Sequence, residues 1–199
     1  MPPLETGDRY HTKEFLRRHD LMPHVKKAEL LENIVYMGSP VRISQHAKPD
    51  SFVQFMLSYY VMLHPECEVG GNGTWIVDPD TTVQPDSFLR YVDGQSSEDE
   101  DGYLNGAPEL VVEVAASSVS IDNHLKKKAF ERAGVREYIV WRVLNNGIDF
   151  WRYDDEAQEF RSVAPDAAGI WSSAVFPGLV LDVPAVLKMD HRAVISKLS

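Results

Sequence analysis

Two acidic residues on strand-like segments are the side chains of this sequence whose types and spacing best suit chemistry. Glu113 stands in the middle of the apolar run 109–116, and Asp86 follows Pro85 in a second strand-like stretch. A glutamate is almost never fully buried unless it is paired or bound to a cation. Two carboxylates on two strands can converge on one hard divalent cation, because Mg²⁺ takes oxygen ligands and keeps several waters. The pair therefore predicts a divalent-cation site.

Three further residues could complete such a site. Lys126 falls one turn into the helix predicted after the Glu113 strand. Helical side chains lean toward the helix N-terminus, so Lys126 can reach back toward the strand end. There it could lower the pKa of a metal-bound water or stabilise negative charge that develops on a phosphate. Glu29 could supply a third carboxylate from a neighbouring element, and His46 could line the site from the start of a long apolar helix.

Each of these residues also has a plain structural interpretation. Glu113 could form a salt bridge to a lysine or arginine, and Asp86 could belong to a turn or begin a strand. The lysine triplet at 126–128 could be a solvated helix face. Their occurrence together on adjacent elements is what favours chemistry over these alternatives.

The elements that must position these residues follow from hydrophobic patterning. Residues 109–116 are nearly continuously apolar, which is typical of a central strand covered on both faces. A helix is predicted next, from a cap at Ser120 or Asp122 to about Ala133, with Gly134 as its C-terminal stop. Further helices are predicted at 12–19, with Thr12 as N-cap, and at 50–63, and strands at 28–37, 75–77, 83–91, 136–143, 148–153, 158–163 and 175–183.

This order of elements predicts the α/β (α+β) class, with a mixed sheet rather than a doubly wound nucleotide-binding fold. With 199 residues, 44% of them hydrophobic, we expect a single domain over 1–199. The helix at 50–63 is apolar almost all round, so we expect it to be buried. The segment 93–106, rich in Asp, Glu, Ser and Gly, reads as a solvated loop.

No targeting or membrane segment is visible in the sequence. The longest apolar run, 52–63, is too short for a bilayer span, which takes about 18 or more residues. The first fifteen residues hold no apolar signal core. Cys67 is the single cysteine, so no intrachain disulfide can form, and we expect a reducing, cytoplasmic setting and no membrane partner.

The formal net charge of −10 argues against broad, non-specific binding of polyanions, which needs clustered lysines and arginines. The charge is uneven, however. Residues 93–101 hold five acids and no base, whereas 9–27 carry six bases against two acids. Local basic surfaces can therefore exist on an acidic protein.

Taken together, the motifs resemble the Uma-two family of putative restriction endonucleases, within the PD-(D/E)XK nuclease superfamily. The matching residues are Pro85-Asp86, Pro108-Glu109-Leu110-Val111-Val112-Glu113-Val114, Ser117-Ser118, Asp122, Lys126, Phe130, Gly134-Val135 and Glu137-Tyr138, with Glu29-Leu30, Ser39-Pro40, His46 and Phe176-Pro177-Gly178-Leu179 on either side. The resemblance runs from about residue 11 to 187, and the spacing of several motifs makes it specific.

The resemblance implies a restriction-endonuclease-like mixed β-sheet core flanked by helices, with extra β-hairpins. It also implies roles for individual residues. Asp86 and Glu113 would be metal ligands and catalytic residues, Lys126 would be the catalytic lysine, and Glu29 would complete the metal shell. His46 and Asp122 are further candidates for lining the site. The expected cofactor is one or two Mg²⁺ or Mn²⁺ ions without an organic cofactor, the substrate is DNA, and a homodimer is plausible.

The sequence departs from the family pattern in three places. The usual tryptophan after Glu137-Tyr138 stands two positions later, at Trp141, and Arg142 replaces an aspartate. The stretch from Glu113 to Asp122 is one residue short, which could shift Lys126 relative to the metal. The acidic loop 93–101 reads as an insertion near the DNA-facing side, which would weaken DNA binding.

Two other functions remain open from the sequence. The nuclease fold could serve as a non-catalytic scaffold or protein-interaction module, because a fold does not by itself imply a function. Hydrolysis of a small phosphoester or nucleotide would also fit a metal site on an acidic protein. An open acidic cleft flanked by lysine or arginine favours catalysis, whereas a cleft closed by its own salt bridges favours the scaffold.

Overall fold

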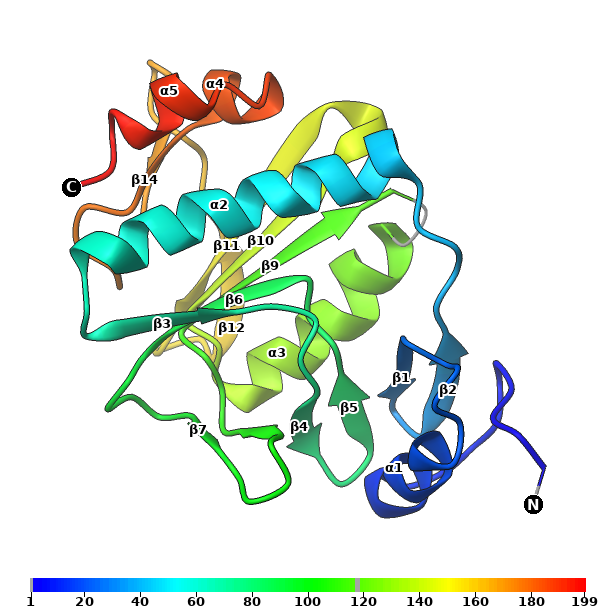
Figure 1. Cartoon of the computed structure of the whole chain (residues 1–199). Helices are drawn as coiled ribbons and strands as arrows, with labels where there is room; N and C mark the ends of the chain where they lie inside the picture. Colours follow the sequence, from blue (N-terminus) through cyan, green and yellow to red (C-terminus); the bar gives the residue numbers. More distant parts are fainter. Residues whose placement is uncertain (1, 117–118) are drawn as a thin grey trace.

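The computed structural model describes residues 2–116 and 119–199 and confirms a mixed α+β architecture. Its centre is a six-stranded sheet in the order β12-β11-β10-β9-β6-β3, in which β9 and β10 are parallel and the other neighbours are antiparallel (Figure 1). The strands are β3 (Cys67–Gly70), β6 (Ser87–Tyr91), β9 (Leu110–Ala115), β10 (Glu137–Arg142), β11 (Gly147–Asp154) and β12 (Glu159–Ser162).

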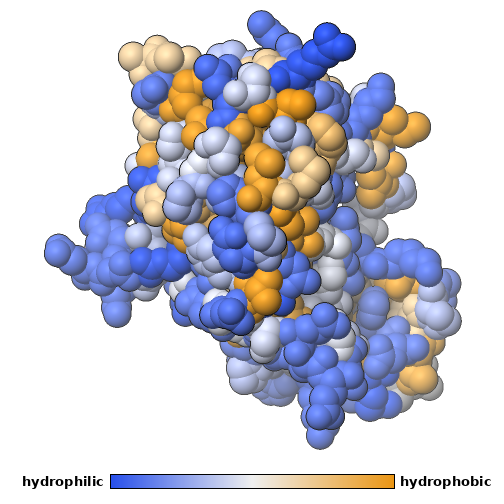
Figure 2. Space-filling model, turned by 60° about the vertical axis from the view of Figure 1, so that its left-hand side comes forward, coloured by the Kyte–Doolittle hydropathy of each residue, from blue (hydrophilic) through white to orange (hydrophobic). Residues whose placement is uncertain are grey.

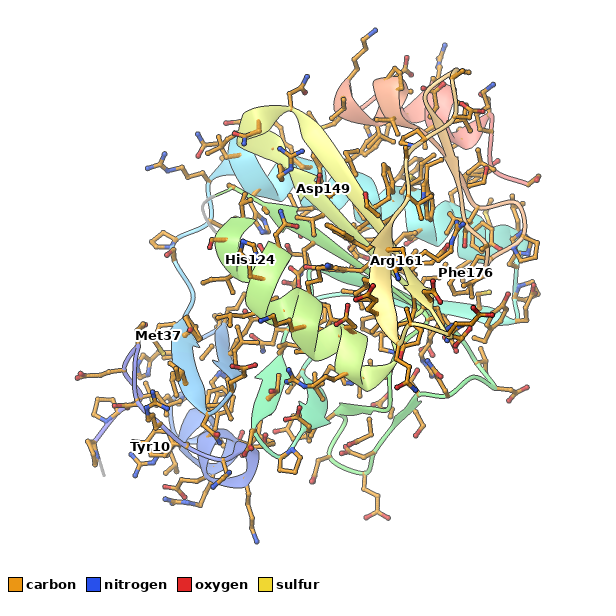
Figure 3. All side chains as sticks on the ribbon, turned by 180° about the vertical axis from the view of Figure 1, so that it is seen from behind. Tyr10, Met37, His124, Asp149, Arg161 and Phe176 are labelled. Carbon is orange, nitrogen blue, oxygen red and sulfur yellow. The ribbon has the colours of Figure 1, made fainter. Side chains whose placement is uncertain are left out.

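Helices cover both faces of this sheet. Helix α2 (Lys48–Leu63) crosses the front face, and the π-helical segment η2 (Ile121–Lys126) runs into α3 (Lys127–Ala133) on the rear face (Figures 1 and 3). Alternate residues of β9 serve the two layers: Leu110, Val112 and Val114 join the core under α2, whereas Val111 and Ala115 join the core under α3. Glu113 belongs to the second set by strand alternation, so its side chain points toward the helix that carries Lys126.

A second sheet lies beside the first, in the order β2-β1-β5-β4-β8-β7. Helix α1 (Thr12–Asp20) packs on it through Phe15, in a small core with Leu30 and Val35. This sheet brings the N-terminal Glu29 toward the rear layer of the large sheet. Its strands are β1 (Ala28–Leu31), β2 (Ile34–Met37), β4 (Trp75–Asp78), β5 (Thr81–Val83), β7 (Ser97–Glu98) and β8 (Leu104–Asn105).

The C-terminal region adds a two-stranded sheet and two short helices beside α2 (Figure 1). These are β13 (Ile170–Ser172), β14 (Val180–Asp182), α4 (Val183–Leu187) and α5 (His191–Ile195). Both helices begin at an aspartate cap: Asp182 accepts the amide of Ala185, and Asp190 accepts that of Ala193. The sequence analysis predicted neither helix, because five residues are too few to show a helical period.

Several expected elements are corrected by the structure. The segment 28–37 is the hairpin β1–β2 rather than one strand, since its two turn residues take left-handed backbone angles. The stretch 83–91 is two strands, interrupted where Pro85 cannot donate a ladder hydrogen bond. The strand at 67–70 was not predicted, and the acidic loop 93–106 holds the strand pair β7–β8.

Two local expectations were also wrong. Thr12 lies inside α1 rather than at its cap, and its hydroxyl donates to the carbonyl of Asp78 in the second sheet. Helix α2 is not buried all round, because its outer side exposes Phe55, Met62 and Leu63. Figure 2, turned toward the C-terminal end of α2, shows hydrophobic patches among hydrophilic surface on that side. Within the described ranges no helix has the length and apolar character to cross a bilayer.

The buried cysteine gives a direct test of the packing at β3. Cys67 lies in the core under α2, and its burial raises the pKa of the thiol to about 11. A free cysteine, with a pKa near 8.5, is roughly one quarter thiolate at about pH 8, whereas a thiol with a pKa of about 11 is roughly 0.1% thiolate. We expect the native protein to react with iodoacetamide at least about a hundredfold more slowly than the same chain in guanidinium chloride. Equal rates would contradict the burial of Cys67.

Candidate active site

Lys126 lies at the centre of a buried cluster of carboxylates. Its Nζ is 2.9 Å from Oε1 of Glu29, 3.0 Å from Oε1 of Glu113 and 3.5 Å from Oδ1 of Asp122. The side chains of Lys126 and Glu113 are only 4% and 2% exposed. The structure therefore brings together residues from β1, β9 and η2 that are far apart in the sequence.

The elements explain why these side chains meet. Glu113 points to the rear layer from the middle of β9, where Val140 of β10 stands beside it in register. Asp122 and Lys126 are four residues apart in η2, and both point back at the strand. Such π-helical segments are rare and frequently occur at functional sites. In Figure 3, which shows the molecule from behind, this helical layer lies in front. His124 of η2 and Met37 at the end of β2 are labelled on the same side of the view.

Asp86 sits at the entrance to β6, next to the Lys126 cluster. Its Oδ2 accepts the backbone amide of Val114 at 2.9 Å and lies 3.3 Å from Nε2 of His46. Its Oδ1 lies 2.9 Å from Nζ of Lys27. Because Val114 directly follows Glu113 in β9, this hydrogen bond holds the Asp86 carboxylate against the strand that carries Glu113, and the two carboxyl groups interact electrostatically.

Gln54 of α2 stabilises the backbone at Asp86 and Ser87. Its side-chain amide donates to the backbone carbonyl of Asp86 at 3.0 Å and to the hydroxyl of Ser87 at 2.7 Å. His46 comes from the short π-helical turn η1 (Ile43–Ala47) that leads into α2. The site is thus assembled from both sheets and from helices on both faces of the large sheet.

Burial and charge shift the pKa values of these groups in different directions. Burial raises the pKa of Glu113 well above its usual value, and the neighbouring carboxylates Asp86, Asp122 and Glu29 add to the rise against the opposing effect of Lys126. Burial would lower the pKa of Lys126, but the attraction of Glu113, Glu29, Asp122 and Asp86 raises it overall. Lys126 therefore remains a charged ammonium at neutral pH.

The pKa of Asp86 shifts in the opposite direction to that of Glu113. Burial would raise the pKa of its carboxyl, but the hydrogen bond from His46 and the charge of Lys27 bring that pKa well below its usual range. The same hydrogen bond raises the pKa of His46. The site thus pairs an ionised Asp86 with a Glu113 that holds a proton more readily, which is the kind of contrast found at active sites.

Three residues at the site were missed by the sequence analysis: Lys27, Asp50 and Gln54. Lys27 directly precedes β1 and lies two residues before Glu29, which is the spacing of residues on one face of a strand. Asp50 and Gln54 follow His46 at intervals of four, which is the spacing of one helix face. Among the described residues Oδ1 of Asp50 is buried without a hydrogen-bond partner, and burial followed by the charge of Asp86 raises the pKa of Asp50. These spacings were the features of the sequence from which the three residues could have been predicted.

The family model Uma2, described as putative restriction endonuclease, matches residues 12–184. The chain belongs to the Uma2 family. No curated protein matches it.

A solved structure resembles the Uma2 fold seen here. It is the crystal structure of a putative nuclease belonging to DUF820 from Anabaena variabilis ATCC 29413, with a TM-score of 0.66 and 13% sequence identity. The match covers 87% of this chain and 97% of that chain. At this identity the likeness establishes the fold.

The departures from the Uma2 pattern have structural counterparts. Trp141 is buried and packs edge-on against Phe52 of α2, and Arg142 forms an ion pair with Asp149 across the β10–β11 hairpin. The shortened stretch before Asp122 does not separate Lys126 from Glu113, which remain in contact. The Ser117-Ser118 part of the motif lies outside the described residues.

The chemistry of the donor set decides how well a divalent cation fits. In residues 2–116 and 119–199 no three His, Cys, Asp or Glu side chains converge closely enough to enclose a metal ion. Mg²⁺ is often held by only one or two carboxylates, with waters and substrate phosphates as its other ligands. Oδ1 of Asp86 and Oε1 of Glu113 each accept one lysine ammonium group, whereas Oε1 of Glu29 accepts both Lys126 and the amide of Gln84. The residues thus suit a two-carboxylate site.

Proposed function

We propose that this chain is a metal-dependent endonuclease that hydrolyses phosphodiester bonds in DNA. The observation that carries the proposal is the contact of Glu113 with Lys126, next to Asp86 on the backbone of β9, in a member of a putative restriction endonuclease family. Asp86 and Glu113 would hold one or two Mg²⁺ or Mn²⁺ ions, with Glu29 as a further candidate ligand. Such an ion, when bound, polarises a phosphate oxygen and makes a bound water more acidic.

The residues of the chain then have distinct parts in hydrolysis. The oxygen of a water forms a bond to phosphorus and the water loses a proton to solvent, while the bond from phosphorus to one ester oxygen breaks and that oxygen takes up a proton as it leaves. Lys126 is held in its charged form by three carboxylates, so it suits orientation of the water and stabilisation of negative charge better than removal of a proton. His46 holds Asp86, and Asp122 holds Lys126; both are positioning residues.

A non-catalytic scaffold is the second candidate, and one observation favours it. Glu29, Asp86, Glu113 and Asp122 each contact a lysine, so the cluster is closed by its own salt bridges. Buried ion pairs of this kind also occur as purely structural networks. The two candidates differ in whether a divalent cation can compete with the lysines.

Calorimetric titration of Mn²⁺ into the wild type, Asp86→Ala and Glu113→Ala distinguishes a nuclease from a non-catalytic scaffold. For a nuclease we expect the wild type to bind about one ion tightly and both variants to lose that binding, with plasmid nicking in Mg²⁺ or Mn²⁺ lost in parallel. Asp99→Ala, in the β7–β8 hairpin, is the control for loose binding by the acidic segment. If all four proteins titrate alike, the nuclease mechanism is wrong and the scaffold is favoured.

A further inference from the structure

Lys27 is the more accessible of the two lysines at the site. It directly precedes β1, and its side chain is 31% exposed, whereas that of Lys126 is 4% exposed. Its Nζ contacts Oδ1 of Asp86 at 2.9 Å. A lysine head on a flexible four-carbon stem can leave one partner for another when a path to solvent is open. Lys27 has that path and Lys126 does not.

The two carboxylate oxygens of Asp86 have different partners. Oδ2 accepts the amide of Val114 and faces His46, so it is fixed by the backbone of β9. Oδ1 faces Lys27. Oδ1 is therefore the oxygen of Asp86 on which a divalent cation would sit. Lys27 also interacts electrostatically with Glu113, the second proposed ligand, so its ammonium group lies within the field of both.

We propose that Lys27 takes the place of the divalent cation on Asp86 in the metal-free protein and moves to a phosphate of the substrate when the cation binds. This inference rests on the proposed function. Two cations on one carboxylate oxygen repel each other, so binding of the ion must displace the ammonium group. A DNA phosphate next to the ion offers the displaced ammonium a new anionic partner, because lysine binds phosphate as a point charge. Binding of the metal and binding of DNA are then coupled through Lys27.

The first test is the affinity for Mn²⁺ in the absence of DNA. Lys27→Met removes the competing ammonium group, so calorimetry should show about tenfold or greater tightening of Mn²⁺ binding, because a charge-assisted hydrogen bond no longer has to break. Lys26→Met removes the same charge from an exposed neighbour without an ion pair to Asp86 and should stay within about twofold of the wild type. Equal affinity in the two variants would overturn the inference.

The second test is the affinity for a short DNA duplex in saturating Ca²⁺, an oxygen-binding cation, measured by fluorescence anisotropy at several salt concentrations. Lys27→Met should weaken binding about three- to tenfold and reduce the slope of log affinity against log salt by about one, as expected for one lost phosphate contact. An unchanged affinity and slope would overturn the transfer to phosphate.

Two further observations keep the outcomes distinct. Lys27→Gln leaves an uncharged donor near Asp86 and should tighten Mn²⁺ binding in the same direction; it replaces Lys27→Met if thermal unfolding shows that the methionine variant does not fold. If the wild type shows no Mn²⁺ binding that depends on Asp86, the proposed function and the inference fall together. If the wild type binds Mn²⁺ but neither Lys27 variant binds it more tightly, only the inference falls.

Discussion

Replacing Lys126 with methionine is expected to destabilise the protein by about 3–5 kcal/mol, because three buried carboxylates then lose their shared cation. Any nuclease activity should be lost in the same variant. Urea unfolding measures the first effect and plasmid nicking the second. Lys128→Met, on the exposed side of α3, is the matched control and should change stability by no more than about 0.5 kcal/mol.

The pH dependence of the Lys126→Met variant follows from the groups around it. Without the ammonium group, Glu113 keeps the burial and the neighbouring carboxylates Glu29, Asp86 and Asp122 that raise its pKa, and loses the group that lowers it. A carboxyl whose pKa is higher in the folded than in the unfolded protein stabilises the fold below its unfolded pKa, and that stability is lost as pH rises through its folded pKa. The destabilisation should therefore grow as the pH rises above the pKa of an unfolded glutamate, about 4.3. A pH-independent loss would show that the carboxylates do not depend on Lys126.

Replacing Phe130 with alanine should have the largest effect on stability outside the site, about 3–5 kcal/mol. Phe130 is fully buried under the rear face of the sheet, with ring centroids 5.2 Å from Trp75 and 5.1 Å from Tyr138. Truncation leaves a cavity between these rings and removes both aromatic contacts. The melting temperature should fall by about 6–20 °C in calorimetry.

Phe55→Ala is the matched control for Phe130→Ala. It makes the same chemical change on α2, where the side chain is 40% exposed, so it should cost far less. Since α3 carries Phe130 and directly continues η2, which ends at Lys126, residual activity in Phe130→Ala should also fall. Equal losses of stability in the two variants would contradict the packing of Phe130 against Trp75 and Tyr138.

The parts of the fold that the sequence predicted are those with a strong local pattern. The strand at 109–116 and the helix that stops at Gly134 are both present, and Gly134 takes a left-handed backbone angle. The break between β5 and β6 was overlooked although Pro85 signalled it. The short C-terminal helices could not be predicted from periodicity, because their stability comes from packing beside α2 and from aspartate caps.

The residues of the candidate site also differ in how clearly the local sequence reveals them. Glu113 stood out because a carboxylate in an apolar strand requires a partner, and the structure supplies Lys126 as that partner. Lys27 did not stand out, because it lies in a basic segment whose lysines resemble solvated surface. Only the approach of the second sheet to Asp86 gives it a specific position, and that long-range contact leaves no trace in the local sequence.

The division of β9 between two cores also affects how the large sheet finds its alignment. A shift of one residue along the neighbouring strands would exchange the two faces of β9 and drive the Glu113 carboxylate into the apolar layer under α2, far from any ammonium group. The penalty for an unpaired buried charge makes that misaligned sheet unstable. The carboxylate that is proposed to hold a metal ion thus also favours the native strand alignment. In Glu113→Leu the free-energy difference between the native and the shifted alignment should be smaller.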